Sequence, residues 1–351
     1  MNEHETQSAE GRPETWLLTG GAGYIGAHVA ESLVRAGRKV VVVDDLSSGR
    51  PERLPAGAEL VTSSVLDTNQ LVEVMMRHRI GGVVHLAAKK AVGESVSQPL
   101  HYYHQNVRGT ASVLEAMSAA GVRRLVFSSS AAVYGVPPAG PVTETTPTSP
   151  INPYGATKLV CEWLVRDAAP ALDLSWISLR YFNVAGAGRP DLGDPGVANL
   201  LQLTLQALSR GARPQVYGDH HATPDGTCIR DYIHVADLAD AHLAAIQQLE
   251  RSLDRGPDAE PGRLGEIYNV GCGRGASVLE VLRTVQRVTG IRRPYEVAAA
   301  RPVDPPDVVA DPSRIESELG WSAKHDLESM VRTAWEAWQH VGVSAGVTAG
   351  S

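Results

Sequence analysis

The stretch Thr19–His28, TGGAGYIGAH, decides the fold of this chain. It places Gly21, Gly23 and Gly26 at the G-x-G-x-x-G spacing, directly after a short apolar run. The first glycine permits a tight turn, the second lets the backbone approach a pyrophosphate, and the third lets the following helix pack closely on the strand. A helix over Tyr24–Ala36 would point its N-terminal amides at that pyrophosphate. The stretch therefore predicts a dinucleotide site between a strand and a helix.

The runs around this stretch indicate the sheet to which it belongs. Short apolar runs without polar alternation, typical of buried parallel strands, alternate with amphipathic helical stretches. Strand and helix in regular alternation predict a doubly wound parallel α/β sheet with right-handed crossovers, a Rossmann-type domain. The expected strands cover residues 15–19, 39–43, 81–86, 122–128 and 174–180, and helices lie between them, one over 107–120.

The end of the second expected strand indicates which dinucleotide binds. Asp44 closes this strand and Asp45 follows it. A carboxylate at this position accepts hydrogen bonds from the ribose 2′-hydroxyl and repels a 2′-phosphate, which favours NAD over NADP. Arg50 lies close enough in sequence to keep NADP as a second possibility.

The composition of the chain changes after about Asn183. Glycine and proline become frequent there, as is typical of binding loops on a rigid scaffold. We expect an NAD-binding domain over 15–182, to which 231–255 and about 266–271 return. A smaller, loop-rich α/β substrate domain is expected over 183–230 and 272–340. Residues 1–14 and 341–351 are expected to be disordered tails.

Composition narrows the class of protein further. The 351 residues carry a formal net charge of −7 and no lysine-rich tract, so we expect a small-molecule substrate and neither a nucleic-acid nor a membrane partner. The widely spaced Cys161, Cys228 and Cys272 are expected to be reduced thiols. The histidines lack carboxylate or cysteine partners at metal-ligand spacing, so no metal site is expected. No apolar leader or spanning run appears in the sequence, and we expect a cytoplasmic location.

The stretch NPYGATK, residues 152–158, is a candidate for acid–base chemistry. With Asn152 as the N-cap, Tyr154 and Lys158 lie four residues apart on one helix face. Lowering the pKa of a phenol by about three units requires about 4 kcal/mol. An ammonium ~4 Å away, at an effective dielectric constant of ~20, supplies about that much. Ser130, in the SSSAAVYG stretch at a strand end, is expected in the same crevice, where it can hydrogen-bond a substrate oxygen.

Eight stretches together resemble a known family. From Trp16 to Trp338 the chain is similar to the extended short-chain dehydrogenases that act on nucleotide sugars, and among them to the UDP-glucose 4-epimerases. The resemblance is found in TGGAGYIGAH, HLAAKKAVGESV, NVRGT, SSSAAVYG, PYGATK, RYFNVAGA, DGTCIRDYIHVADLADAH and YNVGCGRGASVLEV. The resemblance implies an isomerase that interconverts UDP-glucose and UDP-galactose with tightly bound NAD. It also implies a homodimer, paired through helices that include the one bearing Tyr154.

The implied reaction is an oxidation at sugar C4 that is later reversed. Tyr154, helped by Ser130, would take the proton of the sugar 4-hydroxyl while the C4 hydride moves to NAD. The 4-keto sugar would turn over in the pocket and receive the hydride on its other face. Lys158 would also hold the nicotinamide ribose.

The resemblance assigns contacts residue by residue. The cofactor would be held by Gly21, Gly23, Tyr24, Ile25, Gly26, Asp44, Asp45, Leu86, Ala87, Ala88, Lys90, Asn106, Ser130, Tyr154, Lys158 and Phe182. The UDP-sugar would be held by Ser130, Tyr154, Asn183, Asn199, Leu200, Gln215, Tyr217, Arg230, Arg301 and Asp304. A guanidinium offers paired donors to phosphate oxygens, which suits the two arginines. Arg230 could instead pair with neighbouring Asp231, and Lys90 could be a solvated surface residue.

Three positions depart from the pattern of the family. Ser64 stands where an aspartate meets the adenine, and Ala132 replaces a threonine beside the catalytic serine. Val308 stands where a bulky tyrosine can wall off the sugar 2-position. The smaller side chain leads to the hypothesis that UDP-N-acetylglucosamine and UDP-N-acetylgalactosamine also enter.

Other functions remain open from the sequence. Nucleotide-sugar dehydratases and decarboxylases place acidic residues directly after the catalytic serine, whereas this chain has Ala131 and Ala132. A 4-epimerase of a UDP-pentose, a UDP-uronate or a deoxythymidine sugar is an alternative. A catalytically dead NAD-binding regulator is a further one, although nothing would require it to keep Ser130, Tyr154 and Lys158.

Overall fold

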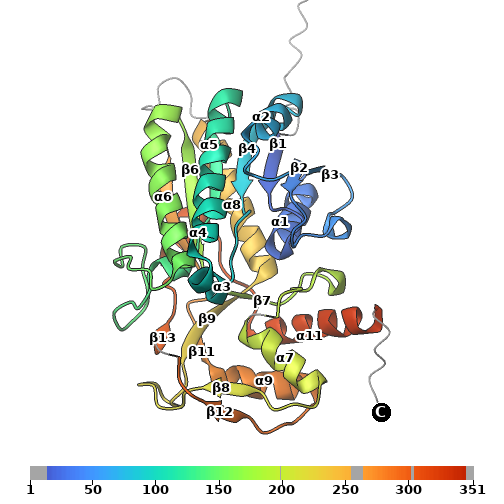
Figure 1. Ribbon diagram of the computed structural model, residues 1–351, viewed down its shortest axis with the longest axis vertical. Helices are drawn as coiled ribbons and strands as arrows, with labels where there is room; N and C mark the ends of the chain where they lie inside the picture. Colours follow the sequence, from blue (N-terminus) through green and yellow to red (C-terminus); the bar gives the residue numbers. More distant parts are fainter. Residues whose placement is uncertain (1–13, 198, 254–263, 302–303, 345–351) are drawn as a thin grey trace, which may run out of the picture.

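The computed structural model describes residues 14–197, 199–253, 264–301 and 304–344 (Figure 1). A large α/β layer forms the upper part of the view, and a smaller part with short strands and helices lies below it. The expected tails, 1–14 and 341–351, fall mostly outside the described residues.

The larger part is built on a seven-stranded sheet in which every pair is parallel. Four of the six residues of β2 are valine, and this strand is buried beyond its first residue, as expected for a strand covered on both faces. The predicted doubly wound α/β fold is confirmed. In spatial order the strands are β10 (Gly265–Val270), β6 (Ser175–Tyr181), β5 (Arg124–Ser128), β4 (Ile80–His85), β1 (Thr15–Thr19), β2 (Lys39–Asp44) and β3 (Ala58–Thr62).

Helices cover both faces of this sheet with two separate apolar cores. One face packs against α1 (Tyr24–Arg35), α8 (Val235–Leu253) and α10 (Ser313–Leu319); the other packs against α2 (Thr68–Arg77), α5 (Gly109–Ala120) and α6 (Pro153–Leu172). The entry to α5 is irregular: α3 (Val92–Ser97), α4 (Pro99–Tyr102) and a π-helical turn over Tyr103–Arg108 precede it. Short 3₁₀ turns occupy Pro51–Arg53, Ala131–Val133 and Pro190–Leu192.

The smaller part has its own sheets and core. A four-stranded sheet contains β7 (Asn183–Ala185), β9 (Ile229–His234), β11 (Gly275–Ser277) and β13 (Asp307–Val308), while β8 (Gln215–Tyr217) pairs with β12 (Glu296–Ala298). Apolar side chains of α7 (Leu200–Ser209), α9 (Val278–Thr289) and α11 (Leu327–Ser344) pack together beneath β7 and β9.

One expected boundary differs from the observed topology. The sequence expectation returned the chain to the larger domain at residue 231. Among the described residues, β9 pairs with β7, β11 and β13 of the smaller part, and the next element, α8, packs on β5, β6 and α1. Apolar content alone does not tell which sheet a buried strand joins, because both sheets offer a covered face. Within the described residues, no helix is long and apolar enough to cross a membrane.

Candidate active site

The glycine turn after β1 is set by contacts that exclude any side chain at two of its positions. A Cβ on Gly26 would lie 2.2 Å from the Gly20 carbonyl oxygen, and one on Gly21 would lie 2.7 Å from Val42. Gly23 is the N-cap of α1 with extended backbone and no side-chain cap. The first amides of α1 are therefore free of a capping side chain, as an incoming pyrophosphate requires.

Asp44 closes β2 beside this turn. Its two carboxylate oxygens accept hydrogen bonds from the backbone amides of Ala22 (3.0 Å) and Leu46 (2.9 Å). Burial raises the pKa of Asp44, and the two amide bonds act against that rise. A carboxylate has about four lone-pair sites, so the fixed oxygens can still accept ribose hydroxyls. Asp45, by contrast, is exposed and accepts from Ser47 N.

The loops after β1 and β4 touch at the point where the strand order of the sheet reverses. The amide of Leu86 donates to Thr19 O at 3.1 Å, and a Cβ on Gly20 would meet Ala87 N at 2.8 Å. Ligands of open α/β sheets bind in the crevice at such a reversal. The predicted cofactor residues Leu86, Ala87 and Ala88 therefore lie beside the glycine turn.

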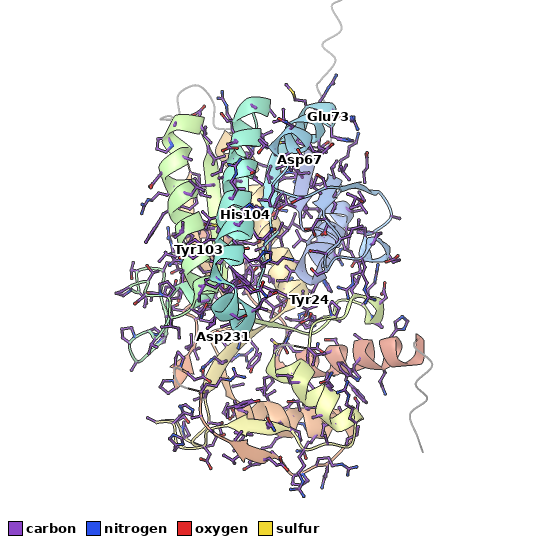
Figure 2. The ribbon with its side chains drawn as sticks, in the orientation of Figure 1. Tyr24, Asp67, Glu73, Tyr103, His104 and Asp231 are labelled. Carbon is purple, nitrogen blue, oxygen red and sulfur yellow. The ribbon has the colours of Figure 1, made fainter. Side chains whose placement is uncertain are left out.

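A π-helical turn positions Asn106 under the β4 loop. Its side-chain oxygen accepts from Lys89 N (2.8 Å), and its amide donates to Lys89 O (3.1 Å) and to Thr157 on α6 (3.0 Å). π-turns are frequent at functional sites because they redirect one side chain. Asn106 thus joins the loop after β4 to the helix bearing Tyr154. Lys90 is exposed, with its ammonium 5.8 Å from the centre of the Tyr24 ring; Figure 2 shows Tyr24 near the level where the two parts of the molecule meet.

Ser130, Tyr154 and Lys158 meet at the carboxyl end of β5. Asn152 caps α6 by accepting from Gly155 N at 2.8 Å, which confirms the predicted start of this helix. All three candidate catalytic residues are buried. The ammonium of Lys158 donates to the backbone oxygen of Ser128 at 2.8 Å and lies 5.1 Å from the centre of the Phe127 ring.

The electrostatics of the pair differ from the sequence expectation. Burial raises the pKa of Tyr154, and a hydrogen bond with Ser130 acts against this rise. Burial also lowers the pKa of Lys158 to about 8. Within the described residues, the Lys158 ammonium donates its hydrogen bond to the Ser128 carbonyl and not to the Tyr154 phenol. In this structure the hydrogen bond that favours the phenolate comes from Ser130, and Lys158 lies in the same buried site without bonding the phenol.

The predicted substrate residues lie on the smaller part and on the loops leading into it. Arg230 pairs with Asp304 rather than with Asp231, whose carboxylate accepts from the amides of Cys272, Gly273 and Ala310. Arg301 stacks over the Tyr217 ring, 4.6 Å from its centre. Figure 2 shows Asp231, the neighbour of Arg230 on β9, where the larger part meets the smaller one. The predicted contacts on this side are Asn183, Asn199, Leu200, Gln215, Tyr217, Arg230, Arg301 and Asp304.

Two predicted contacts already have structural partners. Asn199 is the N-cap of α7, accepting from Gln202 N at 2.9 Å, and its amide donates to Asp194. Gln215 accepts a hydrogen bond from the Tyr217 hydroxyl at 3.0 Å.

Two further residues of the sequence prediction lie in the larger part. Phe182 is buried next to Val133 and Leu159, at the end of β6. Ser64 accepts from Leu66 N, so its hydroxyl is used locally.

Sequence reasoning missed a buried ionic group directly behind this site. Glu162, one turn after Lys158 on α6, forms a bidentate pair with Arg180 of β6. The available signal was a glutamate four residues after Lys158 on a helix face that is otherwise apolar or small.

The chain is similar to known proteins over most of its length. The family model described as "NAD dependent epimerase/dehydratase family" matches residues 16–271. The UDP-glucose 4-epimerase of Azospirillum brasilense is 47% identical over 345 residues, covering 95% of this chain and 96% of that protein. A crystal structure of UDP-glucose 4-epimerase from Stenotrophomonas maltophila with bound NAD and formylated UDP-arabinopyranose superposes with a TM-score of 0.87 at 40% identity, covering 95% of this chain and 99% of that one.

A second solved structure gives the same result. The UDP-glucose 4-epimerase from Brucella ovis in complex with NAD has a TM-score of 0.85 at 40% identity and covers 92% of this chain and 97% of that one. Sequence and fold thus agree over nearly the whole length of the chain. The chain belongs to the NAD-dependent epimerase/dehydratase family.

Proposed function

We propose that this chain is a UDP-glucose 4-epimerase, an isomerase that interconverts UDP-glucose and UDP-galactose with NAD. The main support is that Ser130, Tyr154 and Lys158 lie together at the end of β5 in a chain that is 47% identical to a UDP-glucose 4-epimerase. The residues present fit NAD, because the α1 amides are uncapped and Asp44 is fixed beside them. When bound, NAD supplies the acceptor and then the donor of the C4 hydride.

The chain's own residues hold the proton and orient the sugar. Tyr154 takes the proton of the 4-hydroxyl and later returns it, and the Ser130 hydroxyl hydrogen-bonds the same oxygen during each transfer. Lys158, held by the Ser128 carbonyl, supplies positive charge near the phenol while it is protonated. Arg230 and Arg301 bind the diphosphate, which leaves the sugar free to present either face to Tyr154.

The test is turnover without added cofactor. Incubating the purified protein with UDP-galactose should give UDP-glucose, because an enzyme that keeps its NAD through the cycle needs none from solution. Deoxythymidine-sugars, a UDP-pentose and a UDP-uronate in the same assay discriminate the alternative 4-epimerases. Turnover of only one of these, with UDP-galactose left untouched, would refute the proposed substrate.

The charge on Lys158 predicts an alkaline limb in the pH profile. The pKa of Lys158 is lowered to about 8, so the buried ammonium that adds positive charge to the site, and that would hold the nicotinamide ribose, is present below pH 8 and is lost above it. We expect kcat to fall as pH rises through about 8, by about tenfold per pH unit once the amine is mostly neutral. Initial rates from pH 6.5 to 9.5, with bound NAD quantified at each pH, measure this. A rate that holds steady to pH 9.5 contradicts it.

Val308 is proposed to admit N-acetylated sugars. It lies on β13 opposite Arg230 and packs against the cluster that contains Phe182 and Val133. We expect Val308→Tyr to lower kcat/KM for UDP-N-acetylglucosamine by about 10- to 100-fold and to leave UDP-galactose within about threefold, because a larger side chain excludes the acetamido group sterically. Competition between the two substrates measures the ratio. An unchanged ratio removes Val308 from this role.

We further propose a homodimer and a cytoplasmic location. Large apolar side chains are exposed on α3, α4, the π-turn and the adjacent α6, namely Val96, Leu100, Tyr103 and Trp163. An apolar surface shared by neighbouring helices suits pairing with a second copy. Sedimentation equilibrium of the full chain tests the dimer.

The proposed cytoplasmic location rests on the cysteines. All three are free thiols, which suits a reducing compartment.

A further inference from the structure

A buried ionic network lies behind the catalytic helix. The side chains of Glu162 and Arg180 are only 3% and 5% exposed. Arg180 Nε donates to Glu162 Oε1 at 2.9 Å and Nη2 donates to Oε2 at 2.6 Å, a paired geometry that aligns both groups. Because Glu162 belongs to α6 and Arg180 to β6, this pair joins the helix that bears Tyr154 and Lys158 to the central sheet.

Glu162 has a third partner on the strand end that bears the catalytic serine. Ser129 Oγ donates to Glu162 Oε1 at 2.5 Å. Ser129 stands between Ser128, whose carbonyl accepts from Lys158, and Ser130. One carboxylate therefore sets the position of α6 relative to the β5 end, and with it the relative position of Ser130 and Tyr154.

The network continues from Arg180 to the loop after Ser130. Arg180 Nη1 donates to the Tyr134 hydroxyl at 3.0 Å, and that hydroxyl donates to Asn269 Oδ1 at 2.7 Å. Asn269 in turn donates through its side-chain amide to Val142 O at 2.8 Å. The segment from Ser130 to Val142 is thus tied to β6 and β10 at two points.

Stability alone does not explain a buried ion pair at this place. Removing two charges from water is costly, and apolar residues of similar volume often stabilise a fold as well or better. A role in the reaction would explain its place one turn beyond Lys158. Two groups on the same helix, Cys161 and Glu162, raise the pKa of Lys158 against the effect of burial. Lys158 also faces His85 of β4 and lowers the pKa of that imidazole.

We propose that Glu162 is a positioning residue of the epimerase reaction. It fixes the helix bearing Tyr154 and Lys158 against the strand end bearing Ser130, and it keeps a negative charge one turn from the Lys158 ammonium. The inference rests on the proposed function, because its main readout is turnover of UDP-galactose.

Two variants of the holoenzyme separate positioning from folding. In Glu162→Met with Arg180→Met the buried charges go together, so the melting temperature should stay near that of the wild type. We expect kcat to fall by about 100-fold in this double variant, since small misplacements of reacting groups cost this much, with KM for UDP-galactose within about threefold. In Glu162→Gln, Arg180 remains and the negative charge is lost. The alkaline limb of kcat should then move to lower pH, further than in the double variant.

Asp167→Asn is the matched control, because it removes a carboxylate from an exposed position of the same helix. It should change neither kcat nor the alkaline limb. Wild-type kcat and an unmoved limb in both Glu162 variants would overturn the positioning role. If the double variant does not fold, Glu162→Gln alone decides between the outcomes. Its readouts are a lower kcat at unchanged KM and the pH above which kcat falls. Failure of the wild type itself to turn over UDP-galactose would instead count against the proposed function.

Discussion

Replacing Tyr154 by phenylalanine is expected to lower kcat for UDP-galactose by about 1,000-fold or more while bound NAD and KM stay nearly unchanged. The ring of Tyr154 is buried, so phenylalanine preserves its packing and removes only the hydroxyl. General acid–base groups contribute about 10²- to 10⁴-fold, and the hydroxyl acts only while the proton moves. Initial rates with both UDP-sugars, together with the absorbance of retained NAD, measure the effect.

The control for this change is Tyr295→Phe, which removes a hydroxyl from an exposed tyrosine of the smaller part. It should leave both parameters at wild-type values. A Tyr154→Phe protein with more than about a tenth of wild-type kcat would assign the proton to another group. Ser130 is the nearest alternative, since its hydroxyl bonds the same phenol.

The local parts of the site could be predicted from the sequence because neighbours in the chain create them. The glycine turn, the Asn152 cap and the shared face of Tyr154 and Lys158 follow from spacings of a few residues, and the structure contains the cap as expected. Ser130 could be predicted because parallel strands deliver their carboxyl ends to one edge. These inferences need no knowledge of which strands are neighbours.

The parts that could not be predicted depend on long-range pairing. Asp231 was weighed as a partner of Arg230, its neighbour in sequence, yet its carboxylate is used by the amides of Cys272, Gly273 and Ala310. Glu162 was not singled out because Arg180 lies on the next element along the chain, β6, and meets Glu162 only when α6 packs on that strand. The partner of a buried carboxylate is set by which groups lie near it in three dimensions. This proximity cannot be deduced from spacing along the sequence.

The pKa of Tyr154 illustrates a second limit. The sequence argument placed an ammonium ~4 Å from the phenol and lowered its pKa by Coulomb attraction. The structure buries the phenol, which raises its pKa, and turns the Lys158 ammonium toward the Ser128 carbonyl. Helical spacing fixes which face two side chains share, but their rotamers and desolvation follow from what packs over that face.

Gly26→Ala is expected to have the second large effect, loss of bound NAD together with a lower melting temperature. The added Cβ would lie 2.2 Å from Gly20 O and 2.6 Å from Gly21 Cα, both backbone atoms that cannot rotate away. Overpacking of this kind costs about 3 kcal/mol or more, so we expect a decrease of about 5 °C or more in melting temperature. Because α1 must move off the turn, its N-terminal amides no longer converge on a pyrophosphate.

Gly23→Ala is the matched comparison, because it separates damage to the cofactor site from damage to the fold. Gly23 has extended backbone, φ −77° and ψ −178°, which alanine adopts freely, and its added Cβ would meet Gly20 O at the less severe distance of 3.3 Å. This variant should lose NAD through direct steric exclusion of the pyrophosphate, with a melting temperature close to that of wild-type protein stripped of cofactor. Gly26→Ala should melt below that reference. If both variants melt alike, the third glycine serves the cofactor and not the contact between α1 and β1.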